Sequence, residues 1–158
     1  MIEFDIVPTD VHNKIKQHIF SIENSINWHQ RYWPNSNVLI ADIEVNKANW
    51  EFPLLKQTVE NLYYTFYSSP IKNFLWWVNK YPPHSFQEPH YHSQTVENIS
   101  WNYFLHLPPN SGSFVAGSTA LGDNMEGYIV FFPATLMHEV TPNNSNDIRY
   151  TISGNIRV

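Results

Sequence analysis

The sequence predicts one α+β domain in which helices come first and a run of short strands then closes into a sandwich or barrel. Apolar residues recur at helical spacing in the first third of the chain. From Ile71 onward, aromatic and β-branched runs alternate with Pro, Gly, Asn and Ser clusters, a pattern typical of strands and turns. A length of 158 residues suits one domain. We therefore expect a mainly helical part at 1–70 and a strand core at 71–158.

Two helices are expected before the strands. The first begins near Pro8-Thr9-Asp10, where Thr9 or Asp10 is suited to cap the free backbone N–H groups. Its apolar stripe is Val11, Ile15, Ile19, Ile22 and Ile26. The second begins near Pro53 and stops before Pro70. Its stripe is Leu55, Val59, Leu62, Tyr63 and Phe66. Both helices should pack on the outside of one sheet.

Seven strands are expected after them, with a clear turn at Pro108–Gly112. Their ranges are Lys72–Lys80, Pro89–Ser93, Ile99–Leu107, Ser113–Ala116, Gly127–Phe132, His138–Thr141 and Ile148–Val158.

Composition and charge narrow the function classes. The net charge is −5 and the nine Lys and Arg are spread thinly, so no basic stripe indicates a nucleic-acid partner. There is no cysteine, so a metal would need nitrogen or oxygen ligands. No apolar run has the length of a membrane span, and the N-terminus lacks the features of a signal peptide. We expect a soluble cytoplasmic protein with no membrane partner; a dimer is compatible with the sequence, which does not decide the oligomeric state.

A His-x-His pair lies in Pro89-His90-Tyr91-His92. Residues two apart on a strand point to the same face, so the two imidazoles project together and are placed to share one metal ion. Taken alone, the pair is more often an exposed strand with two polar side chains.

A third histidine follows a buried strand. Gly127 to Phe132 is apolar throughout, a proline turn follows at Pro133, and the chain then reaches His138. A lone histidine here is more often a core residue with a hydrogen-bond partner. In combination with the upstream pair, His90, His92 and His138 predict a metal site.

A candidate anion site lies near the C-terminus. Strand alternation places Arg149, Thr151 and Ser153 on one face. A guanidinium pairs with a carboxylate through two parallel hydrogen bonds, and a hydroxyl adds another donor. A solvated surface arginine is an equally good interpretation of Arg149 alone.

With these motifs in order, the stretch from Trp77 to Asn155 resembles the 2-oxoglutarate- and iron(II)-dependent oxygenase superfamily, most of all its short members whose first metal motif is His-x-His. The resemblance implies a double-stranded β-helix (jelly-roll, cupin-like) barrel. It implies that His90 and His138 are iron ligands and that Arg149, eleven residues beyond His138, binds the distal carboxylate of 2-oxoglutarate. It also implies that Thr151 assists the arginine and that Asn79 and Tyr103 face the same cavity and contact the cosubstrate.

One residue departs from the superfamily pattern. Where a carboxylate ligand is usual, this chain has His92, so the metal has one negative charge fewer and a stronger hold on an anionic cosubstrate. The same residues also resemble the cupin pattern, in which Glu97 would be a fourth ligand. The cupin pattern does not include an arginine at the position of Arg149.

The expected function is therefore a dioxygenase, an oxidoreductase that uses Fe(II), 2-oxoglutarate and O2 to hydroxylate an unidentified small molecule or peptide. An amino-acid or peptidyl side chain is the preferred substrate, by analogy. No catalytic residue is expected beyond the metal ligands. Two alternatives stay open: a cupin-like dioxygenase or isomerase that uses no 2-oxoglutarate, and a non-catalytic metal-binding barrel.

Overall fold

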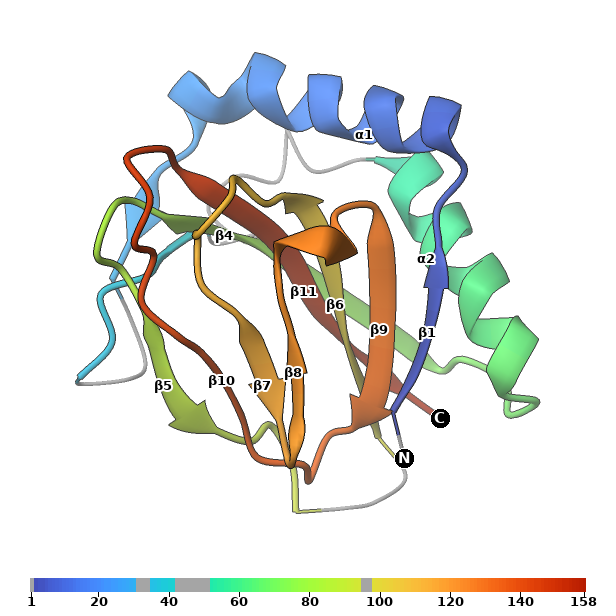
Figure 1. The fold of residues 1–158 in the computed structure, drawn as a ribbon. Helices are drawn as coiled ribbons and strands as arrows, with labels where there is room; N and C mark the ends of the chain where they lie inside the picture. The colour runs from blue at the N-terminus through green and yellow to red at the C-terminus, as the bar shows by residue number, and fades with distance from the viewer. Residues whose placement is uncertain (1, 31–34, 42–51, 95–97) are drawn as a thin grey trace.

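The computed structural model describes residues 2–30, 35–41, 52–94 and 98–158. Two antiparallel sheets face one another, and two helices lie on the far side of the larger sheet (Figure 1). The helices are α1 (Thr9–Ile22) and α2 (Pro53–Phe66), with short 3₁₀ turns at Glu23–Ser25 and Asp123–Met125. This is the helices-then-barrel arrangement that the sequence predicts, and the helices do cover one sheet.

The larger sheet has seven strands in the order β1-β9-β6-β11-β4-β3-β2. Their bounds are β1 Glu3–Ile6, β9 Tyr128–Pro133, β6 Ile99–His106, β11 Arg149–Arg157, β4 Asn73–Tyr81, β3 Leu39–Ala41 and β2 Trp28–His29. The smaller sheet has the order β5-β10-β7-β8. Its bounds are β5 Gln87–His90, β10 His138–Val140, β7 Phe114–Ala116 and β8 Thr119–Leu121.

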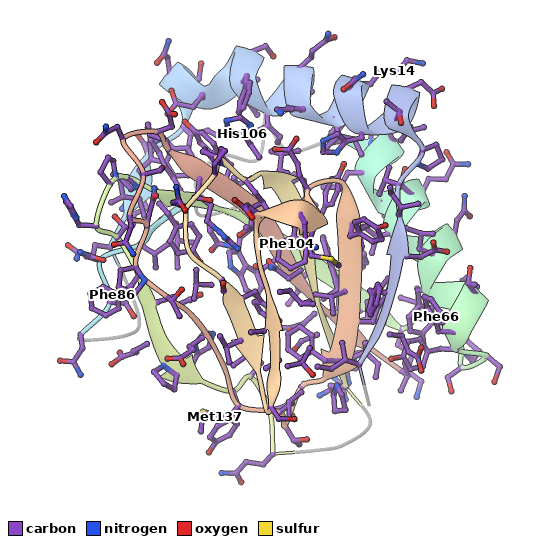
Figure 2. All side chains as sticks on the ribbon, viewed as in Figure 1. Lys14, Phe66, Phe86, Phe104, His106 and Met137 are labelled. Carbon is purple, nitrogen blue, oxygen red and sulfur yellow. The ribbon has the colours of Figure 1, made fainter. Side chains whose placement is uncertain are left out.

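Two hydrophobic clusters hold these layers together. One lies between the helices and the outer face of the larger sheet, and it includes Ile15 and Ile19 of α1 with Leu55 and Val59 of α2. These are members of the two predicted stripes. The other cluster fills the space between the sheets, where Phe104 lies (Figure 2). Alternation along the strands assigns each side chain to one cluster or the other.

Several boundaries differ from the predictions. The N-terminal part is not only helical, because β1, β2 and β3 add to the larger sheet, and β8 was also not predicted. These strands have only two to four residues, too few for the pattern of side chains to identify a strand. The predicted cap on the first helix is wrong: Pro8 occupies the N-cap position and no side chain caps the helix. Proline in the first turn of α2 is confirmed. Neither of these helices has the length and apolar character that crossing a membrane requires.

Candidate metal centre

His90 and His138 meet because two strands of the smaller sheet pair. β5 and β10 run antiparallel with His90 directly opposite His138. Both side chains are buried, with 7% and 5% of their surface exposed. Their ring centroids lie 4.2 Å apart. Strand pairing therefore places two of the three predicted ligands side by side.

His92 reaches the same point by a different route from the predicted one. The predicted strand Pro89–Ser93 is shifted, because β5 is Gln87–His90 and His92 follows its end. The backbone N–H groups of His92 and Ser93 both donate to the carbonyl of Ala134, at 2.9 and 3.1 Å. These bonds tie the segment to the β9–β10 connection and bring Nε2 of His92 to 3.1 Å from Nε2 of His138.

The three rings have the geometry of a metal-binding set. One candidate ligand atom from each histidine lies within 4.8 Å of the others. Two nitrogens at right angles on one metal, each about 2.1 Å from it, would be about 3.0 Å apart, close to the 3.1 Å between His92 and His138. Without a metal, the same distance suits a hydrogen bond between the two rings.

Backbone carbonyls orient two of the rings. Nδ1 of His90 lies 2.7 Å from the carbonyl of Glu88, and Nδ1 of His138 lies 2.9 Å from that of Leu136. With Nδ1 protonated and donating, Nε2 is the unprotonated nitrogen, which is the form that binds a metal.

Burial keeps these imidazoles neutral. It lowers the pKa of His138 to about 3, and repulsion from the other two rings adds to the effect. Burial and, to a smaller extent, the neighbouring His90 lower the pKa of His92 to about 4, and burial also lowers the pKa of His90. At neutral pH the three imidazoles are therefore uncharged, the protonation state in which histidine binds a metal.

The histidines line a cavity between the two sheets. Its other lining residues are Trp77, Tyr81, Gln87, Trp101, Asn102, Phe114, Phe132, Val140 and Ser153. Trp77 packs against His92 with 5.7 Å between ring centroids, and Phe132 packs edge-on against His138 at 4.8 Å. The rings of His92 and His138 therefore lie against aromatic side chains, which limit the access of water.

Arg149 is fully buried at the start of β11. Its Nη1 donates to the carbonyl of Gly112 at 2.8 Å, while Nε and Nη2 are buried without a hydrogen-bond partner. Burial lowers the pKa of Arg149 to about 10, so it is still a cation at neutral pH. A buried charge with unpaired donors is costly, and an anion bound here would remove that cost. The residues present thus fit a carboxylate as well as a metal.

Tyr81 lies beside the guanidinium and lines the cavity. The guanidinium carbon is 5.9 Å from the centroid of the Tyr81 ring and 6.0 Å from that of Phe104. The Tyr81 hydroxyl donates to Oε1 of Gln87 at 3.2 Å. Tyr81 and Gln87 line the cavity but Arg149 does not, so Tyr81 is the residue that contacts both the guanidinium and the cavity.

Thr151 and Asn79 lie together, on the inner face of the larger sheet. They are opposite each other in the β11–β4 pairing, and Nδ2 of Asn79 donates to Oγ1 of Thr151 at 3.0 Å and to Oγ of Ser153 at 2.7 Å. Ser153 in turn donates to Oδ1 of Asn102 at 2.8 Å. These uncharged side chains form a polar ladder across the three central strands.

Tyr103 does not join them, so its expected place in the cavity is corrected. It belongs to the cluster beneath the helices, and its hydroxyl is hydrogen-bonded to Nδ1 of His12 on α1. Alternation along β6 turns Asn102 and Phe104 inward and Tyr103 outward. Asn102, Tyr81 and Gln87 are cavity residues that the sequence prediction missed; a correct register between β11 and β6, which pairs Ser153 with Asn102, would have found the first. Glu97, the fourth ligand of the cupin interpretation, lies outside the described residues.

No protein-family model matches the chain, and no curated protein matches it in sequence. Solved structures do. The chain is similar to a Pseudomonas putida prolyl-4-hydroxylase, with a TM-score of 0.71 and 15% identity over 99% of this chain and 92% of that one. The chain is also similar to a Trichoplax adhaerens prolyl hydroxylase in complex with a hypoxia inducible factor oxygen degradation domain peptide fragment. The TM-score is 0.77 and the sequence identity is 16%, over 99% of this chain and 82% of that one.

A third similar structure is the nogalamycin-biosynthesis epimerase SnoN in complex with Fe3+, alpha ketoglutarate and nogalamycin RO, with a TM-score of 0.71 and 12% identity over 99% of this chain and 78% of that one. The predicted fold is therefore confirmed: this chain has the double-stranded β-helix fold that 2-oxoglutarate- and iron-dependent oxygenases share.

Proposed function

We propose that this protein is a non-haem iron(II) dioxygenase that uses 2-oxoglutarate and O2 to hydroxylate its substrate. The observation that carries the proposal is the pairing of a three-histidine cluster with a buried, incompletely paired guanidinium inside one barrel. The fold shared with oxygenases adds support. A cupin-like protein without 2-oxoglutarate would leave Arg149 without a role.

His90, His92 and His138 would hold the iron through their Nε2 atoms. Their Nδ1–carbonyl bonds fix the orientation of two rings, which lowers the entropy lost when the metal binds. Iron, 2-oxoglutarate and O2 together supply the oxidising chemistry, in which the cosubstrate becomes succinate and CO2 and a C–H bond becomes C–OH. The side chains around the cavity would bind and orient the cosubstrate and the substrate.

Arg149 would bind the distal carboxylate of 2-oxoglutarate with Nε and Nη2, the two donors that have no partner. Thr151 lies two residues further on the same strand face and would add a hydroxyl contact. Asn79 would orient Thr151 through their hydrogen bond. Tyr81, which lies beside the guanidinium and also lines the cavity of the histidines, would contact a dicarboxylate that reaches both.

For the substrate we propose an amino-acid or peptidyl side chain. Two similar structures are prolyl hydroxylases, and one of them is in complex with a peptide. The SnoN epimerase has the same fold and is in complex with nogalamycin RO, so the fold alone does not determine the substrate.

Anaerobic spectroscopy tests the proposal. The protein is loaded with Fe(II), 2-oxoglutarate is added, and the visible metal-to-ligand charge-transfer band is measured together with succinate formation after O2 is admitted. We expect a band in the unmodified protein and its loss in Arg149→Ala. Arg157→Ala, at the exposed end of the same strand, is the matched control and should keep the band. Iron binding without any band would contradict the proposal and favour the cupin-like alternative.

A further inference from the structure

A second cleft lies where the end of α1, the end of β6 and the start of β11 meet. Its volume is about 500 Å³, and its lining includes Phe20, Glu23, His106, Asp147, Ile148 and Tyr150. None of these residues lines the cavity of the three histidines. Figure 2 shows His106 and Met137, the neighbour of His138, at opposite ends of the barrel. The cleft is therefore separate from the candidate metal centre.

Aromatic rings form one wall of this cleft. Phe20 packs edge-on against His106 and against Tyr150, with 5.7 and 5.3 Å between ring centroids. These contacts bury Tyr150 to 7% exposure but leave Phe20 42% exposed. Ile148, half-buried, adds aliphatic surface beside them. A fixed aromatic ring that is open to solvent in a concave surface can pack against an apolar or planar group of a ligand.

The two cations nearest to this wall are already neutralised. The ammonium of Lys80 pairs with the carboxylate of Glu23, and both side chains are largely buried. The ammonium of Lys16 lies 3.5 Å from a carboxylate oxygen of Glu126. Neither lysine is therefore left to balance a further acid in the cleft.

Asp147 is that further acid. Its backbone is held in place, because its carbonyl accepts hydrogen bonds from Nδ2 of Asn143 at 2.8 Å and from Oγ of Ser145 at 2.9 Å. Its side chain is exposed, and among the described residues nothing pairs with the carboxylate. Burial lowers the pKa of His106 and the charge of Asp147 opposes that effect, so the carboxylate acts on the lining of the cleft. The cleft thus combines an aromatic wall with one unbalanced negative charge.

We propose that this cleft binds an arginine side chain of a partner polypeptide, with the guanidinium paired to Asp147 and stacked on Phe20. A guanidinium is planar, so it stacks on an aromatic ring while its N–H groups donate to a carboxylate, and its aliphatic stem is suited to pack on Ile148. Lysine, a compact and strongly hydrated charge, fits this arrangement less well. The net charge of −5 on the chain also favours a basic partner. The proposal is independent of the proposed function, because neither metal nor cosubstrate takes part.

The test is a titration of the metal-free, ¹⁵N-labelled full chain, followed by the amide signals in ¹H–¹⁵N correlation spectra. The probes are acetyl-Gly-Arg-Gly-amide and the same peptide with lysine or with citrulline in place of arginine. Citrulline has nearly the shape of arginine but no charge. We expect the arginine peptide to shift the signals of Phe20, Asp147 and Ile148 in a saturable way. The lysine peptide should bind more weakly, and the citrulline peptide should cause no shifts.

Matched variants assign the binding to the two contacts. Asp147→Asn should raise the Kd of the arginine peptide about two- to fivefold, as expected for an exposed ion pair, and Asp147→Lys should abolish binding. Asp10→Asn removes an exposed acid from the first turn of α1 and should leave the Kd unchanged. Phe20→Leu should raise the Kd, whereas Tyr64→Leu, at an exposed tyrosine on α2, should not.

Several outcomes would overturn the proposal. They are the absence of shifts with the arginine peptide, equal binding of the citrulline peptide, and an equal effect of Asp147→Asn and Asp10→Asn, which would mean that only the overall charge of the chain matters. The comparison of peptides on the unmodified protein decides the question even if a variant does not fold. Binding of Co2+, an air-stable substitute for iron(II), tests the histidine site on the same samples, so the two proposals succeed or fail separately.

Discussion

His90 and His138 face each other across the β5–β10 pair, with 4.2 Å between their ring centroids. The pair depends on strand register alone, since a one-residue slip would turn one ring out of the barrel. The smaller sheet thus provides two of the three candidate metal ligands, while the candidate anion-binding residues belong to the larger one. This division leads to predictions that test each part separately.

His138→Ala should remove metal binding. The ring would contribute one of three ligands, and loss of a group that merely hydrogen-bonds to a ligand commonly costs about 10–100-fold in metal affinity. We therefore expect the Kd for Co2+ to rise by about 100-fold or more, measured by calorimetry. His84→Ala changes an exposed histidine outside the cluster and should bind Co2+ as the unmodified protein does. Normal binding by His138→Ala would exclude this residue as a ligand.

The metal-free protein should lose stability in acid before carboxylates protonate. The pKa of His138 falls from 6.5 to about 3 on folding, and that of His92 to about 4. Unfolding therefore takes up protons below pH 6.5, so this stability is fully present above that pH and is lost as the pH falls toward 3. Urea unfolding between pH 7.5 and 4.5 should show a decline on the order of 1 kcal/mol per pH unit. A flat profile would mean that these rings are not buried as neutral groups.

Arg149→Met should separate binding from stability. The substitution removes a buried cation whose Nε and Nη2 lack partners and puts an apolar chain of similar length among Tyr81 and Phe104. Replacing buried charges by apolar groups is often neutral or stabilising. We expect an unchanged or higher Tm without ligand and no measurable 2-oxoglutarate binding. A large fall in Tm would instead assign Arg149 a structural role.

Tyr103→Phe should weaken the fold and leave the site intact. It deletes the hydroxyl that pairs with buried His12, at a cost of about 1–3 kcal/mol. Chemical denaturation measures that cost, and Co2+ and 2-oxoglutarate affinities should not change because Tyr103 faces the helices. The control is Tyr128→Phe, at a half-buried tyrosine. Weaker cosubstrate binding in Tyr103→Phe would restore the role that the sequence suggested.

Gly154→Ala should be severely destabilising. A Cβ at Gly154 would lie 2.2 Å from the carbonyl oxygen of Leu75 and 2.4 Å from the Trp101 ring, so β4, β11 or β6 must shift. Overpacking of this kind costs about 1–3 kcal/mol or more. Gly122→Ala, where the nearest atom is 3.8 Å away, should be close to neutral. Thermal unfolding of the two variants makes the comparison, and equal Tm values would contradict it.

Periodicity and residue type were enough to predict the two helices, most strands of the barrel and the three histidines, because each leaves a local signal. Alternation correctly placed Arg149, Thr151 and Ser153 on one face. The short strands β1, β2, β3 and β8 were missed, since two to four residues give too little pattern.

Tertiary structure alone decided three features of the site. They are the side of the sheet to which Tyr103 points, the position of Tyr81 next to Arg149 and the cavity, and the route by which His92 joins the other two histidines. Each depends on register between strands far apart in the chain, which local sequence does not encode. What the sequence determined by itself is therefore the set of chemical groups and the fold class. Which of those groups share one cavity was decided by the pairing of β11 with β4 and β6 and of β5 with β10, because side-chain orientation on a strand follows from register and not from residue type.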